Sequence, residues 1–150
     1  MSQTNVSSKS ILAKLLSAED ITVIHGADAP TASFDVKNRV LTLPCWTNMS
    51  NSLYDMLVGH EVSHALYTPN SDSDGWFQIE AMAKALDMPA STVKLYANVV
   101  EDARIERMIK DKFPGLKRDF ANAYAQYATD DLFKIAGKDV NDLSILDRIN

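Results

Sequence analysis

Two histidines and a glutamate with the spacing of a zinc site stand near the middle of the chain, in the run His60-Glu61-Val62-Ser63-His64. Residues four apart lie on one face of a helix, so both histidines can reach one ion from that face. Glu61 lies about 100° around the helix axis, beside the ion rather than on it. There it can accept a proton from a metal-bound water, whose pKa falls to about 7 on zinc. The run predicts a zinc-dependent hydrolase with His60 and His64 as ligands and Glu61 as base.

A catalytic zinc ion usually has three protein ligands and an open position for water. The metzincin pattern is not continued, because Tyr67 and Asn70 occupy its glycine and third histidine positions. We therefore expect a carboxylate from a second helix. Glu101 is the candidate because it shares a helix face with Ala97 and Ile105, and a carboxylate on such a stripe is costly to bury unless paired or metal-bound.

Three residues close to Glu101 are expected to support the site. Asp102 can hydrogen-bond a ligand histidine, Arg104 can orient a carboxylate or meet substrate charge, and Asn98 stands one turn before. The alternative is a surface cluster in which these acidic residues pair with Arg104 and Arg107.

A tyrosine is the expected donor for the oxyanion of a hydrolytic reaction. Tyr67 shares a helix face with both histidines and is the first candidate, while Tyr124 and Tyr127 can arrive from a later helix. Core packing is the alternative for each of them. His25, the third histidine of the chain, is expected in a loop rather than at the metal.

The composition is that of one globular domain of 150 residues, in which residues 1–8 are polar and expected to be disordered. A net charge of −5 gives no general attraction to nucleic acid or to anionic membranes, so neither is expected as a partner. Cys45 is the only cysteine, which excludes an internal disulfide and fits a reducing compartment. The sequence has no signal peptide or membrane span, so we expect a cytoplasmic protein.

Local patterns predict an α+β fold, with a small N-terminal antiparallel sheet packed on a mostly helical core. Strands are expected at residues 21–24, 33–36 and 40–43, and helices at 9–17, 50–67, 76–86, 91–112, 116–136 and 143–149. Ser52 and Ser91 are the expected N-caps, and Asn38 the left-handed residue of a hairpin turn.

Two further segments have alternative interpretations. The strand from Val40 to Leu43 is either an edge strand that pairs with an extended polypeptide substrate or an ordinary sheet strand. The run from Asn70 to Gly75 resembles the start of an EF-hand calcium loop. Ala81 replaces the glutamate that should complete that loop, which favours a simple polar connection.

The narrower signal is Asn98-Val99-Val100-Glu101-Asp102-Ala103-Arg104-Ile105-Glu106, 37 residues after the second histidine. Together with the histidine run, it resembles the gluzincin-type metallopeptidase domains of some phage and bacterial proteins, often followed by a von Willebrand factor A domain. The similarity extends from about residue 34 to residue 127.

This resemblance implies a zincin-like core that hydrolyses polypeptides, with Zn²⁺ held by His60, His64 and Glu101 and with Glu61 as base. It also implies the host cytoplasm if the protein is phage-encoded. The chain is then the N-terminal part of a longer protein with a possible C-terminal von Willebrand factor A domain.

Three functions are therefore open: a zinc peptidase, a zinc-stabilised protein-interaction module without proteolytic activity, and a metal-free helical fragment. Zinc binding separates the third from the others. Glu61→Gln separates the first two, since it should abolish hydrolysis while leaving zinc and the fold in place.

Overall fold

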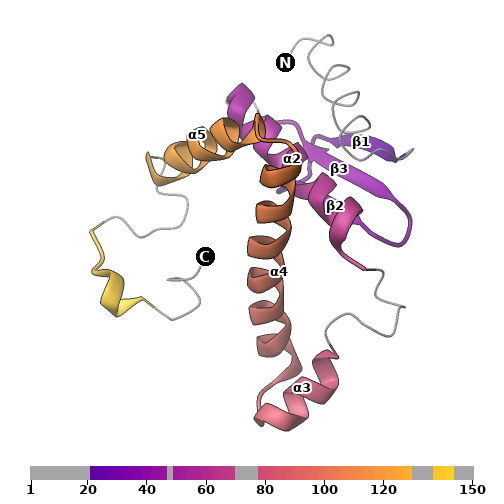
Figure 1. Cartoon of the computed structure of the whole chain (residues 1–150), viewed down its shortest axis with the longest axis vertical. Helices are drawn as coiled ribbons and strands as arrows, with labels where there is room; N and C mark the ends of the chain where they lie inside the picture. Colours follow the sequence, from indigo (N-terminus) through magenta and orange to yellow (C-terminus); the bar gives the residue numbers. More distant parts are fainter. Residues whose placement is uncertain (1–20, 47–48, 70–77, 130–136, 144–150) are drawn as a thin grey trace.

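The computed structural model describes residues 21–46, 49–69, 78–129 and 137–143. The segments predicted at 1–8, 9–17 and 70–75 lie outside these residues, as do all but the first residue of the helix predicted at 143–149 and the last part of the helix predicted at 116–136. In chain order the elements are β1 (Thr22–Gly26), β2 (Ser33–Asp35), β3 (Val40–Pro44), α2 (Asn51–Tyr67), α3 (Ile79–Leu86), α4 (Ala90–Lys112), α5 (Leu116–Thr129) and the 3-10 helix η1 (Val140–Asp142). A small sheet thus precedes the helices, which confirms the predicted α+β class (Figure 1).

The sheet has the order β1-β3-β2, with β2 antiparallel and β1 parallel to β3. It is therefore mixed, and the prediction of a purely antiparallel sheet is wrong for β1. The hairpin between β2 and β3 is confirmed. Its left-handed residue is Arg39, with φ of 56°, rather than Asn38. The backbone N–H of Asn38 instead donates to the carboxylate of Asp35, at 2.9 Å.

The position of β3 corrects a second expectation. It is paired on both sides, so of the two interpretations of Val40 to Leu43 the edge strand is wrong and the ordinary sheet strand is confirmed. Leu41 and Leu43 of β3 are fully buried, which gives a physical reason, because a strand with such residues belongs in the middle of a covered sheet. The strand at the edge beside α2 is β2, and it contacts that helix.

Helix α2 is anchored at both ends. Its N-cap is Ser50, whose hydroxyl accepts from the backbone N–H of Leu53 at 3.1 Å, whereas the sequence favoured Ser52. The Ser52 hydroxyl instead donates to Asp119 of α5, at 3.0 Å. The helix ends at Thr68 before Pro69, as predicted.

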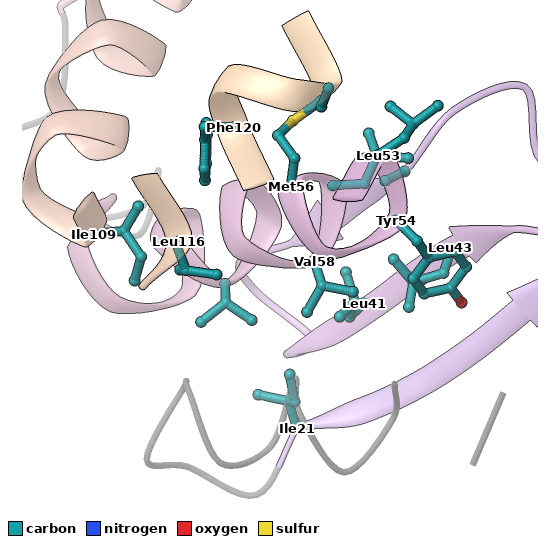
Figure 2. Close-up of a cluster of buried hydrophobic side chains, with 14 residues drawn as sticks. Ile21, Leu41, Leu43, Leu53, Tyr54, Met56, Val58, Ile109, Leu116 and Phe120 are labelled. Atoms are coloured by element: carbon teal, nitrogen blue, oxygen red, sulfur yellow. The ribbon is translucent and has the colours of Figure 1, made fainter. Parts of the chain in front are cut away.

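The core lies between the sheet, α2 and α5 (Figure 2). Leu41 of β3 and Val58 of α2 meet on one side of α2, and Phe120 covers another side. Helix α5 approaches closely because Gly59 has no side chain: a Cβ there would stand 3.2 Å from Phe120 Cε2 and 3.3 Å from Leu116 Cδ1. This packing fixes the helix turn that carries the first histidine.

Helix α4 runs along the long axis of the molecule, and α3 packs at its N-terminal end (Figure 1). It begins at Ala90 after Pro89, so Ser91 is not the cap. Between α3 and α4 is an apolar groove lined by Met82, Leu86, Met88, Val93, Tyr96, Ala97 and Val100. Among the described residues, no helix combines the length and the apolar character needed to cross a membrane.

Candidate metal centre

His60 and His64 lie on the same side of α2, with ring centroids 5.1 Å apart, and face Asp102 of α4. The Nε2 atom of His64 is 3.4 Å from Asp102 Oδ1, and that of His60 is 3.8 Å from the same oxygen. Tetrahedral ligands about 2.0 Å from a zinc ion lie roughly 3.3 Å from each other, so these separations are close to those of a metal site. The three residues are the group within the described chain that could hold a metal ion.

The second nitrogen of His60 is held by a carboxylate. Its Nδ1 lies 3.1 Å from Oε1 of Glu106, one turn beyond Asp102 on α4. Tyr124 of α5 donates to the same oxygen at 2.7 Å, and Lys110 donates to Oε2 at 3.1 Å. Although burial opposes ionisation, these donors and the charge of His60 hold the pKa of Glu106 below its ordinary value.

The second nitrogen of His64 is held by a hydroxyl. Its Nδ1 lies 2.9 Å from Thr68 Oγ1, and the Thr68 hydroxyl donates to Glu101 Oε1 at 2.7 Å. Because the threonine proton is already given to Glu101, the hydroxyl oxygen accepts from His64. This chain of two hydrogen bonds places the proton of neutral His64 on Nδ1.

The same logic applies to His60, because an ionised carboxylate can only accept. Both neutral imidazoles therefore carry their proton on Nδ1 and direct the Nε2 lone pair at Asp102. Lone pairs and a carboxylate repel each other unless a cation lies between them. A proton can play that part: despite burial, the hydrogen bond that His60 donates to Glu106 and the nearby carboxylates raise the pKa of His60. A metal ion is the other cation that the arrangement suits.

Glu61 is buried, with 7% of its surface exposed, and lies between the histidine-bearing helix and β2. Burial raises its pKa, against the charges of His60 and His64, and the backbone N–H of Phe34 donates to its carboxylate. A carboxylate poised in this way can accept a proton from a water beside the histidines. Glu61 thus lies in the same cleft as His60 and His64, and its role as a base stays a prediction.

Glu101, the predicted third ligand, is not in the group with the two histidines. It is 2% exposed and accepts from Nε and Nη2 of Arg104, each at 2.7 Å, as well as from Thr68. Burial would raise its pKa, but these donors hold it below the ordinary value. The structure brings Asp102, expected as a support, close to both histidines, while Glu101 as a ligand stays a prediction.

The remaining predicted residues are placed as follows. Arg104 orients the Glu101 carboxylate and also donates to the backbone oxygen of Tyr67, at 2.8 Å. The described residues that line the cleft do not include Tyr67, whose side chain packs against the core. Asn98 lines the cleft. His25, at the end of β1 rather than in a loop, lies 3.0 Å from the Tyr54 hydroxyl through its Nδ1.

Two supports were missed by the sequence reasoning. Glu106 follows Asp102 by four residues, so the two carboxylates share a face of α4, which is the signal that could have found it. Thr68 follows His64 by four residues, but it lies at the helix end, where the next turn cannot be assumed to be helical.

A cleft of about 650 Å³ opens over the site. One wall is β2 and the residues flanking it, from Thr31 to Lys37, and the opposite wall comes from α2 and α4. Both histidines, Glu61 and Asp102 line it, so a molecule in the cleft reaches the two imidazoles and the buried carboxylate together.

Comparisons with protein-family models, with curated proteins and with solved structures give no match for this chain. The function is therefore inferred from the residues of the site.

Proposed function

We propose that this protein is a zinc-dependent hydrolase, with polypeptides as the substrate class. The observation that carries the proposal is the paired orientation of His60 and His64. Each Nδ1 is held by a separate partner, and each Nε2 faces the same carboxylate oxygen, 3.8 and 3.4 Å away. Ligand histidines in metal sites are oriented in this way, by a partner on the nitrogen that does not bind the metal.

The donor set fits zinc. Two imidazoles and one carboxylate, with a fourth position open to the cleft, are typical of catalytic zinc sites. His60, His64 and Asp102 would hold the ion, with Glu101 as the alternative carboxylate. When bound, zinc would act as a Lewis acid towards a carbonyl and lower the pKa of a coordinated water to about 7.

Glu61 would serve as the proton acceptor. It follows His60 directly and is therefore turned about 100° away from the ligand face, towards β2. Its burial keeps bulk water from competing for the carboxylate, and the N–H of Phe34 fixes its orientation. A proton taken from water on this side is available for the leaving amine of a peptide.

The substrate would lie along β2 rather than β3. Strand β2 is paired with β3 through Ser33, Phe34 and Asp35, and its other edge faces Glu61 and the cleft. Exposed strand edges bind extended peptides through backbone hydrogen bonds. A peptide there passes over the histidines, so its carbonyl groups come within reach of the metal-binding atoms.

The test combines zinc content with hydrolysis. The purified protein should contain about one zinc ion per chain and cleave unfolded proteins or a peptide library. Glu61→Gln should lose cleavage by at least about 100-fold and keep its zinc. The matched control is Glu80→Gln, on the exposed side of α3, which should keep both. A wild-type protein that binds no zinc would contradict the proposal.

A zinc-stabilised interaction module is the second candidate, because the groove between α3 and α4 is apolar and includes exposed Leu86 and Val100. Exposed apolar surface of this kind marks protein-binding sites. If the zinc-loaded protein cleaves nothing and Glu61→Gln changes no property, the module is the better description.

A further inference from the structure

Helix α5 acts on His60 from two directions. Leu116 and Phe120 pack against Gly59, so they set the position of the α2 backbone just before the histidine. Farther along α5, the Tyr124 hydroxyl donates to the carboxylate of Glu106, which in turn holds the His60 ring. Helix α5 thus sets the position of both the backbone and the ring of His60, although the two are far apart in the sequence.

The Glu106 carboxylate is nearly buried, at 8% exposure, and its two oxygens are divided between partners. Oε1 accepts from both Tyr124 and His60, whereas Oε2 accepts from Lys110. Because Tyr124 and His60 share one oxygen, the tyrosine determines which oxygen faces the imidazole and at what angle. Without that donor, the carboxylate can rotate about its terminal torsion, which is broad for glutamate.

The contribution of the Tyr124 ring can be separated from that of its hydroxyl. Tyr124 is 38% exposed, and its ring lies beside Phe120 and Tyr127, with ring centroids 6.4 and 6.3 Å away. A phenylalanine would keep these contacts and lose only the hydrogen bond. The hydroxyl is a firm donor, since burial and the adjacent carboxylate raise the pKa of Tyr124 well above its ordinary value.

We propose that Tyr124 is a positioning residue of the metal centre, which acts through Glu106 to orient His60 for metal binding. The inference rests on the metal site of the proposed function and adds α5 as the element that sets its affinity. Loss of a direct partner of a ligand histidine lowers metal affinity by about 10–100-fold. Tyr124 acts one hydrogen bond farther away, so we expect a weakening of about three- to tenfold.

The test measures zinc affinity by competition with a chromogenic chelator in the full chain. Tyr124→Phe should bind zinc about three- to tenfold more weakly than wild type. The control is Tyr96→Phe, in the separate groove between α3 and α4, which should bind as wild type does. In a Glu106→Gln background, Tyr124→Phe should have almost no further effect, because the group through which it acts is gone.

Two results would overturn the inference: a Tyr124→Phe protein with wild-type affinity, or a loss of equal size in both backgrounds, which indicates a general structural role. If wild-type protein binds no zinc, the proposed function fails instead. In that case, imidazole ¹⁵N NMR of the zinc-free protein at alkaline pH tests the positioning role separately. Tyr124→Phe should shift the His60 signals and leave those of His64, and unchanged His60 signals would refute it.

Discussion

The two histidines of the site are supported by the same kinds of group in a different order. His60 contacts the carboxylate of Glu106 directly, and a hydroxyl and a lysine lie behind that carboxylate. His64 contacts the hydroxyl of Thr68, and a carboxylate and an arginine lie behind it. Both arrangements place the proton on Nδ1, but only the first has an anion in contact with that nitrogen.

This difference separates two tasks of a supporting residue. A carboxylate in direct contact both orients an imidazole and raises its basicity, whereas a neutral hydroxyl mainly orients it. We therefore expect His60 to be the stronger donor to a metal and His64 the more easily replaced. The two supporting carboxylates each have a cationic partner, Arg104 for Glu101 and Lys110 for Glu106, which offsets the cost of burying their charge.

The largest effect should come from the residue that both halves share. Asp102→Asn removes the charge facing both Nε2 atoms. It should weaken zinc binding by more than about 100-fold, which is more than the loss of any residue that supports a histidine. Glu101→Gln should weaken zinc binding by about tenfold, because Glu101 acts on His64 through Thr68. Chelator competition measures both, and a reversed order would make Glu101 the ligand that the sequence predicted.

On the His60 side, Glu106→Gln keeps the size of the side chain and removes its charge. The imidazole loses basicity as well as orientation, so zinc affinity should fall by about 10–100-fold. Glu80→Gln, at an exposed position of α3, serves as control. An effect smaller than that of the Thr68 variant would contradict the ranking of the two histidines.

On the His64 side, Thr68→Val keeps the shape and removes both hydrogen bonds. The Nδ1–H of His64 then loses its acceptor, and the protein should lose about 1–3 kcal/mol of unfolding free energy. Zinc affinity should fall by about tenfold, at the low end for such partners. Denaturant titration and chelator competition test this, with Thr129→Val as control, because that hydroxyl donates to the Ala125 carbonyl within α5 in an exposed position.

The smallest expected effect is on the stability of the protein at acidic pH. The pKa of Glu101 is lowered in the folded protein, so its contribution to stability is complete above the unfolded value of about 4.5 and is lost as pH falls through the folded value. The zinc-free protein should therefore become easier to denature below about pH 4.5. In Glu101→Gln, the stability should depend less on pH in this range. If it depends on pH as it does in wild type, the ion pair between Glu101 and Arg104 contributes little.

The placement of the HExxH residues on one helix could be predicted from the sequence because it depends on spacing within that helix. His60, Glu61 and His64 need only the helical period to be placed relative to one another. Which of Glu101 and Asp102 faces the histidines could not be predicted in this way. These neighbours differ by about 100° around α4, and only the packing of α4 on α2 decides between them.

Long-range pairing limited the fold prediction in a similar way. The β2–β3 hairpin is local and was predicted, whereas the parallel pairing of β1 with β3 joins strands separated by another strand. The sequence alone does not separate Ser50 from Ser52 as the cap of α2, because both serines suit the position. A contact with Asp119 on a distant helix takes Ser52 for another bond.

The placement of α3 against only one end of α4 has a consequence for local unfolding. Only Ala83 of α3 is buried, and among the described elements the helix makes its main contacts with α4. Amide protons of such a helix exchange with solvent through openings that leave the rest of the domain folded. The carboxylates of the site lie farther along α4, where that helix packs against α2. Deuterium should therefore enter α3 first, while the histidine turn of α2 stays protected until the whole domain opens.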